Sequence, residues 1–83
     1  MVRVLFFASL REALGTGRED LQLASPATVS TLVETLRGRG GAWSEQLAPE
    51  RRWRVAVNQN MARLGDAIGD GDEVAIFPPV TGG

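Results

Sequence analysis

The group in this sequence best placed to do chemistry is the α-carboxylate of Gly83. The last stretch, Asp70–Gly83, reads DGDEVAIFPPVTGG, so this carboxylate follows two residues without side chains, Gly82 and Gly83. Two glycines make the thinnest possible chain, which can enter a narrow cleft. An α-carboxylate with its ordinary pKa of about 3.3–3.7 is ionised at neutral pH and is a poor electrophile. It can accept another group only after a separate reaction has supplied a leaving group.

A frayed and idle terminus is the ordinary explanation of such an ending. At an average glycine usage of about 7% per position, two terminal glycines arise by chance in roughly one chain in 200. A predicted strand leads straight into this pair, which makes chance a poorer explanation. We therefore interpret the ending as a functional arm, with the idle tail as the alternative.

A turn and a strand come before this arm. The turn is predicted at residues 70–72, because Asp and Gly tolerate the positive φ angles that tight reversals need. The strand follows over 73–77, where Val74 and Ile76 alternate with their neighbours at the period of a half-buried strand.

Pro78 and Pro79 then remove two backbone donors, so pairing in the sheet must end there or soon after. We expect a folded domain over residues 1–79. Residues 80–83 then leave it as an extended tail that reaches roughly 13 Å, at about 3.3–3.6 Å per residue.

Earlier in the chain, one segment has the pattern of an amphipathic helix. Thr28 is a good N-cap. Four apolar residues follow at the spacing of one helix face, namely Val29, Leu32, Val33 and Leu36. Packing of this face against a sheet explains the stripe. Three glycines then predict the end of the helix and a flexible connector, namely Gly38, Gly40 and Gly41.

Most of the remaining segments alternate apolar and polar residues at the period of strands, and two short ones are expected to be helical. The expected elements are a strand over 2–9, a helical turn over 10–14 closed by Gly15, a strand over 20–24, a short helix over 44–47 interrupted by Pro49, a strand over 54–59 and a returning strand over 61–64.

This order predicts an α+β fold of the β-grasp, or ubiquitin-like, kind, with one main helix packed on a mixed sheet of about five strands. The helix supplies the right-handed crossover between parallel strands. The first and last strands then lie side by side in the middle of the sheet. Phe7 and Phe77 are therefore expected to be neighbours on the face away from the helix.

Two exposed phenylalanines, with Met61 beside them, would form an apolar patch that a monomer is expected to hide. We interpret the patch as a partner interface, because Phe and Met are enriched at interface centres. The alternative is that the connector over 41–50 covers the patch, with Trp43 as the cover. Arg11, placed near the end of the first strand, can add a salt bridge at the rim.

A second candidate is the arginine cluster around Trp53. Arg51, Arg52 and Arg54 could bind a phosphate or an acidic partner. A solvated strand edge that uses charge to block aggregation is the explanation the sequence favours.

Composition excludes much of the usual chemistry. The 83 residues include no Cys and no His, and all nine basic residues are Arg. Nucleophile–base pairs, thiolate metal sites and Schiff-base lysines are therefore excluded. A net charge of −1 gives no field that would draw nucleic acid or anionic lipid. We expect a small cytoplasmic domain with no nucleic-acid or membrane partner, no bound cofactor and no metal.

Acidic residues near the last turn offer one metal alternative. Asp70, Asp72 and Glu73 suggest the start of a calcium loop, but the ligand spacing does not continue downstream. Turn chemistry is the simpler explanation.

Three stretches carry a resemblance to a known family. VRVLFFASLREALG at the start, Val57–Gln59 in the middle and DGDEVAIFPPVTGG at the end resemble the small subunits of molybdopterin synthase, the MoaD type of sulfur carrier in the MoaD/ThiS family. The resemblance covers essentially the whole chain, and the ending is its most specific part.

The resemblance implies a route for sulfur. An adenylating enzyme of the ubiquitin-activating type would use ATP to activate Gly83, and sulfur would replace AMP to give a thiocarboxylate. The loaded tail would enter the large subunit of molybdopterin synthase, in a heterotetramer of two large and two small subunits. There it would donate sulfur to the cyclic pyranopterin precursor of the molybdenum cofactor. This chain would be a co-substrate without catalytic side chains of its own.

The resemblance also implies which residues meet the partners. They are Phe7, Arg11, Met61 and Phe77 on the domain, and Pro78, Pro79, Val80 and Thr81 on the way to Gly82 and Gly83. Two alternatives keep the Gly83 chemistry and change the acceptor. One is a sulfur carrier for thiazole synthesis or tRNA thiolation, and the other is a ubiquitin-like modifier of other proteins.

Overall fold

A computed structural model describes residues 1–78, and residues 79–83 lie outside this description. Its helices and strands in chain order are β1 (Val2–Phe6), α1 (Ala8–Leu14), β2 (Arg18–Leu21), β3 (Ala27–Thr28), α2 (Val29–Arg37), α3 (Gly41–Gln46), β4 (Arg54–Val57), β5 (Asn60–Ala62), β6 (Ala67–Ile68) and β7 (Glu73–Phe77).

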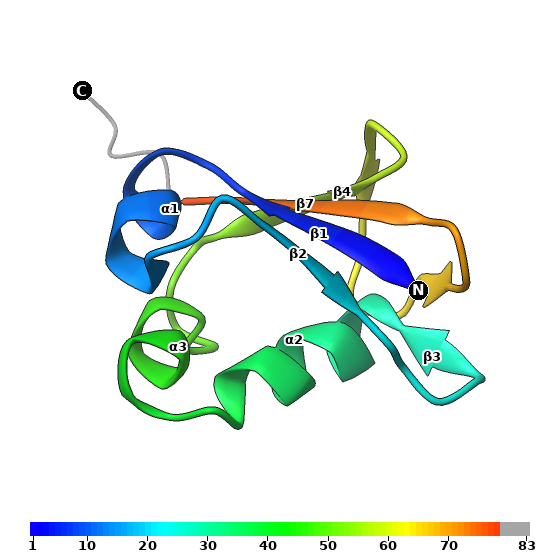
Figure 1. The fold of residues 1–83 in the computed structure, drawn as a ribbon, viewed down its shortest axis with the longest axis horizontal. Coiled ribbons are helices and arrows are strands. Elements are labelled where there is room, and N and C mark those ends of the chain that lie inside the picture. The colour runs from blue at the N-terminus through cyan, green and yellow to red at the C-terminus, as the bar shows by residue number, and fades with distance from the viewer. Residues whose placement is uncertain (79–83) are drawn as a thin grey trace.

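The main sheet has the strand order β2-β1-β7-β4-β5. At its centre β1 and β7 pair in parallel, with Val4 opposite Val74, and the other neighbours are antiparallel. Parallel neighbours need a crossover, which α2 provides. Figure 1 shows α2 and α3 on the same side of this sheet. The predicted α+β arrangement, one main helix on a mixed five-stranded sheet, is confirmed.

The core lies between the sheet and α2. On the sheet side, alternate residues of the central strands point inward and are almost fully buried, for example Val4 and Ile76, each with 0% exposure. On the helix side, the whole predicted stripe is buried as well, namely Val29, Leu32, Val33 and Leu36. Burying such a side chain contributes roughly 1.5–3 kcal/mol, so this helix–sheet contact is the main stabilising feature of the domain.

α2 begins where the sequence predicts, at the N-cap Thr28. The Thr28 hydroxyl accepts a hydrogen bond from the Thr31 amide at 3.2 Å, and the Thr31 hydroxyl accepts one from the Thr28 amide at 3.3 Å. This reciprocal pair is a capping box, in which a threonine takes the place usually held by Glu or Gln.

Four predicted strands have wrong boundaries. The first strand ends at Phe6 and not at Ser9, because Ala8 has a φ of 51° and the Phe7 carbonyl already accepts the first bonds of α1, from the Leu10 and Arg11 amides. The second strand occupies 18–21 and not 20–24, because it pairs along β1 with Leu5 opposite Arg18. The strands predicted over 54–59 and 61–64 occupy 54–57 and 60–62, because Asn58 and Gln59 form the tight turn between them.

The connector after α2 is also more ordered than expected. It was predicted to be flexible, with a short helix over 44–47, whereas α3 begins at Gly41. Gly40 and Gly41 both have positive φ, so these glycines make the sharp turn that starts the helix. The reason for the order is packing, since Leu47 at the end of α3 is fully buried.

A small second sheet was not predicted. β3 and β6 form one antiparallel pair, with Ala27 opposite Ile68, just before α2 begins. Among residues 1–78, no helix is long and apolar enough to cross a membrane.

Candidate functional site: an apolar sheet face beside the last strand

The sheet face away from α2 is apolar along its middle. The ladder registers put Leu5 opposite Ala75, Ala75 opposite Ala56, and Ala56 opposite Met61, so these residues form one row across four strands. Two residues further along the chain, Phe7 directly follows β1 and Phe77 ends β7. We call this surface the outer face, made of Leu5, Phe7, Ala56, Met61, Ala75 and Phe77.

Phe7 and Phe77 are in direct contact on the outer face. Their ring centroids are 4.9 Å apart and the ring planes differ by 10°, so the rings are stacked. Phe7 is still 40% exposed, although it is a large apolar side chain. The prediction that Phe7 and Phe77 are neighbours is therefore confirmed. Part of this aromatic pair remains exposed and can contact a partner protein.

Met61 lies on the same face but not against the aromatic pair. It is 63% exposed, and it is separated from β7 by the width of β4. An exposed methionine on the same sheet face as a partly exposed aromatic pair suits an interface centre, because its flexible thioether side chain adapts to a partner surface.

The connector does not cover the outer face. Trp43 in α3 packs edge-to-face on Phe6, which points into the core, with ring centroids 5.4 Å apart. The Arg39 guanidinium lies over the Trp43 ring at 4.6 Å. Figure 1 shows α3 on the α2 side of the sheet. The alternative in which Trp43 hides Phe7 and Phe77 is therefore wrong.

The aromatic pair lies where the last strand ends. β7 stops at Phe77, and Pro78, the last described residue, follows it directly and is half-buried. The other predicted residues of the tail lie outside the described residues, namely Pro79, Val80, Thr81, Gly82 and Gly83. The predicted boundary between a domain over 1–79 and a tail over 80–83 falls there too and stays a prediction.

Arg11 lies inside α1, which directly follows β1 and contains the helical turn predicted over 10–14. The residue is exposed, and its side chain runs beside Gly17, where an added Cβ would come within 2.9 Å of the Arg11 Nε. Its salt bridge to a partner stays a prediction.

The acidic residues near the last turn serve the fold. Asp72 accepts hydrogen bonds from the Asn58 side chain at 3.0 Å and from the Gly69 amide at 2.8 Å, and these bonds lower the pKa of its carboxyl from the ordinary 3.8. Asn58 in turn accepts a bond from the Glu73 amide at 3.0 Å. Within the described residues no group of three or more acidic side chains is arranged to hold a metal ion.

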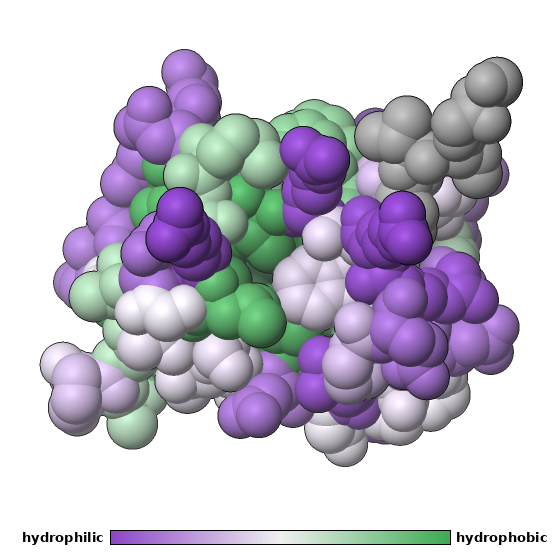
Figure 2. All heavy atoms as spheres, turned by 180° about the vertical axis from the view of Figure 1, so that it is seen from behind, coloured by the Kyte–Doolittle hydropathy of each residue, from purple (hydrophilic) through white to green (hydrophobic). Residues whose placement is uncertain are grey.

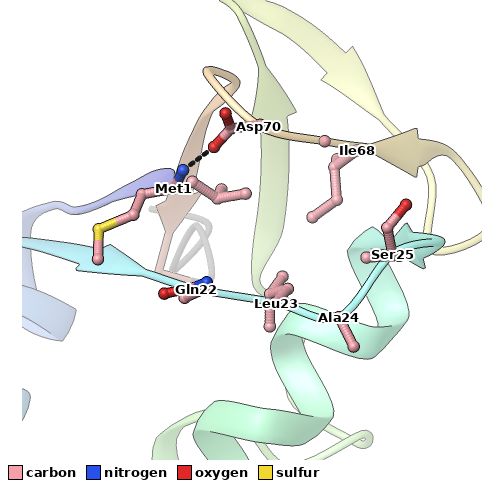
Figure 3. A pocket seen from close by; sticks show the side chains of 10 residues that line it. Met1, Gln22, Leu23, Ala24, Ser25, Ile68 and Asp70 are labelled. Carbon is pink, nitrogen blue, oxygen red and sulfur yellow. Dashed lines mark hydrogen bonds and ion pairs between the residues drawn. The ribbon is translucent and has the colours of Figure 1, made fainter.

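A hollow on another part of the surface involves the N-terminus. It lies between Met1 and the segment over 22–25 that follows β2, and Figure 3 shows the Met1 ammonium bonded to the Asp70 carboxylate at its edge. Because its main charged groups already pair with each other, this hollow offers little for a charged ligand.

Three members of the outer face were missed from the sequence, Leu5, Ala56 and Ala75. Their alternation with buried neighbours was a usable signal for Leu5 and Ala75. Ala56 is only 5% exposed, and its neighbour Val55 is buried as well, on the opposite face of the sheet. A strand that is buried on both faces shows no alternation of apolar and polar residues. The sheet order is therefore needed to tell which face Ala56 belongs to.

The sheet order, the crossover helix and the apolar outer face define a ubiquitin-like β-grasp domain. More narrowly, the chain belongs to the ThiS family, whose model matches residues 4–83.

Similar proteins include sulfur carrier subunits and a small protein modifier. The chain is 40% identical to the molybdopterin synthase sulfur carrier subunit of Escherichia coli and 44% identical to that of Haemophilus influenzae, with all of both chains covered in each case. Among solved structures, it resembles small archaeal modifier protein 1 of Haloferax volcanii with a TM-score of 0.84 and 30% identity, over 95% of this chain and 97% of the other.

Proposed function

We propose that this chain is the sulfur-carrier subunit of molybdopterin synthase, and that the Gly83 carboxylate carries the sulfur. The support from similarity is full-length identity of 40–44% to proteins of that name. The single observation that carries the proposal is the position of the stacked Phe7–Phe77 pair. Phe77 is the last residue of β7, and the segment that leads to Gly83 follows it in the chain. A partner that binds the aromatic pair therefore binds next to the start of this segment.

The chemistry takes place at the backbone terminus, in two steps. First, a carboxylate oxygen of Gly83 bonds to the α-phosphorus of ATP and pyrophosphate leaves, which converts a poor electrophile into an acyl adenylate. Next, a sulfide nucleophile attacks the carbonyl carbon, the bond to AMP breaks, and a thiocarboxylate remains. ATP is bound by a separate adenylating enzyme, so this chain needs no cofactor of its own.

The thiocarboxylate sulfur then bonds to a carbon of the cyclic pyranopterin precursor in the large subunit and displaces an oxygen substituent. Water cleaves the acyl–sulfur bond, so the sulfur stays on the pterin and Gly83 returns to a carboxylate. Acid and base groups come from the large subunit, since this chain has neither His nor Cys. We propose that Phe7, Met61 and Phe77 bind both the adenylating enzyme and the large subunit in turn, and that two large and two small subunits assemble. Use of the same face would make the two complexes mutually exclusive.

A second function has its own support, from the likeness to small archaeal modifier protein 1. A modifier would transfer the Gly83 acyl group to an amine of another protein. The two functions share activation at Gly83 and differ in the acceptor.

Intact-mass spectrometry tests the proposal. The chain is expressed with and without the adenylating enzyme and a sulfur donor, and a variant lacking Gly83 serves as the matched control. We expect a mass gain equal to sulfur replacing one oxygen, located on the C-terminal peptide and absent from the control. An unchanged mass under conditions that load another ThiS-family carrier would refute the proposal, and covalent conjugates to other proteins would favour the modifier function.

A further inference from the structure

A groove opens at the β5 edge of the main sheet. Its floor is formed by side chains of α2, β4 and the segment after β5, namely Val29, Val55 and Leu64. The segment before β4 provides one wall through Trp53. Figure 2, the view from behind Figure 1, shows apolar surface around a hollow near its centre and hydrophilic side chains on the rim.

On one side of the groove, the apolar side chain is held by a hydrogen bond and by packing. On the other side, the apolar side chains are exposed. The Trp53 indole Nε1 donates a hydrogen bond to the Ala48 carbonyl at 3.0 Å, and its ring packs against the core. Leu64 is 50% exposed and Met61 is 63% exposed, so two of the four exposed large apolar side chains in residues 1–78 border this one groove. Such a concentration of exposed apolar side chains marks a binding surface.

The rim of the groove is basic. Arg51, Arg54 and Arg63 all line it and are all exposed. Arg51 approaches Glu45 at 3.9 Å, a distance between exposed groups that contributes little. Within residues 1–78, no carboxylate lies within 4.0 Å of the Arg54 or Arg63 guanidinium. The groove therefore carries local positive charge on a chain whose net charge is −1.

We propose that this groove binds an acidic segment of a partner protein, with one apolar side chain seated between Trp53 and Leu64 and carboxylates paired with the three arginines. Guanidinium groups bind carboxylates through paired hydrogen bonds, which matches the charge of the rim. An apolar floor suits a peptide side chain. A free phosphate would gain nothing from such a floor, and a nucleic acid needs a longer basic track than three residues provide.

The groove is continuous with the outer face. The proposal for the groove does not rest on the sulfur chemistry at Gly83. Met61 belongs to both surfaces, and Arg54 lies opposite Phe77 in the β4–β7 ladder while it also lines the groove. A protein that docks on the outer face can thus reach the groove with an acidic arm that passes the β5 edge. Acidic residues at the rim would also speed association through long-range attraction.

The test uses the ¹⁵N-labelled full chain and a synthetic peptide in which a central Leu-Phe pair is flanked by Asp and Glu. The same peptide with Asn and Gln in place of the acids is the matched control. We expect saturable shifts of the Trp53 indole and of the amides over 61–64, with a Kd on the order of 0.1–1 mM. Raising the salt from about 0.05 M to about 0.3 M should weaken binding about tenfold, because exposed charges are screened.

Charge reversal then separates the groove from general charge effects. Arg54→Glu combined with Arg63→Glu should weaken the acidic peptide about tenfold or more. Arg18→Glu, in the opposite edge strand β2, should leave it within about twofold. Both variants change exposed residues, and an otherwise unchanged amide spectrum shows that they fold.

Three outcomes would overturn the proposal: equal binding of the neutral peptide, equal loss in the Arg18→Glu variant, or no saturable shift at peptide concentrations of several times the expected Kd. Saturable binding of inorganic phosphate or a single-stranded oligonucleotide at the same residues, without binding of the peptide, would also overturn it. None of these readouts involves Gly83, so the groove and the proposed sulfur chemistry can fail separately.

Discussion

The rings of Phe7 and Phe77 stack at 4.9 Å although the two residues stand at opposite ends of the chain. The parallel register of β1 and β7, with Leu5 opposite Ala75 and Phe6 opposite Ile76, brings them together. The stack lies at the point where the last strand ends. It also leaves apolar surface exposed at that point, which is the arrangement expected of a domain that presents its C-terminal segment to partners.

Removal of either ring should reduce partner binding. We expect Phe7→Ala and Phe77→Ala each to weaken binding to the large subunit of molybdopterin synthase by at least about 2 kcal/mol, or roughly thirtyfold, as for an aromatic hot spot. Isothermal titration calorimetry measures this change. Phe7→Leu, which keeps apolar surface, should lose less. If both alanine variants bound like the wild type, the outer face would not be the interface.

The capping box of α2 should have a measurable effect on stability. Thr28→Ala removes the acceptor of the Thr31 amide, and we expect a loss of about 1 kcal/mol in the free energy of unfolding by urea. Thr28→Ser keeps the hydroxyl and should stay close to the wild type. Equal stability of the alanine variant would mean that water replaces the cap without cost.

The hairpin between β4 and β5 offers a stabilising change. Asn58 and Gln59 both have positive φ, 50° and 70°, as in the two-residue type I′ turn that favours Asn-Gly. Gln59→Gly should relieve left-handed strain of roughly 1–2 kcal/mol. It should add chain entropy worth about 0.4–1 kcal/mol to the unfolded state. We therefore expect a net gain of about 0.5–1 kcal/mol in urea unfolding.

Asn58→Gly is the matched control for this turn. It supplies the same backbone freedom but removes the bonds to Asp72 and to the Glu73 amide, so it should destabilise the domain. A Gln59→Gly variant less stable than the wild type would show that the turn is not strained.

An ion pair should make stability depend on acid pH. Hydrogen bonds from the Arg39 guanidinium hold the pKa of the Glu19 carboxyl below its ordinary value of 4.5, and burial opposes this shift. Since the unfolded chain binds the proton more readily, this stabilisation is present above about pH 4.5 and is lost as the pH falls through the folded-state pKa.

The pH dependence is read from Glu19→Gln. The variant should be less stable than the wild type by a few tenths to about 1 kcal/mol at pH 7, the range of partly exposed ion pairs. This difference should vanish in acid. Asp72 is also stabilised in its charged form, but it is present in both proteins and cancels in the comparison. A difference that grew toward low pH would have the wrong sign for this ion pair.

Much of the fold could be predicted because its signals are local and repeated. The stripe from Val29 to Leu36 has helical period, and it ends up buried along its whole length. The crossover rule then put the first and last strands side by side, from which the contact of Phe7 with Phe77 followed.

The errors come from features that depend on three-dimensional context. Nothing in the local sequence marks Ala8 as a residue with positive φ, yet this angle ends β1. Gly41 is a helix breaker by propensity, but it begins α3 because Trp43 packs on Phe6. β3 and β6, with two residues each, are too short to show any period.

The central claim is that the Gly83 carboxylate, and no side chain, transfers the sulfur. Its most direct measurement is a single-turnover assay in which the thiocarboxylated chain, the large subunit and the pterin precursor are mixed and product is counted. We predict one sulfur transferred per loaded chain, and no transfer after deletion of Gly83 or addition of one residue beyond it, with the thermal midpoint of unfolding unchanged. Transfer that persisted in either tail variant would contradict the claim.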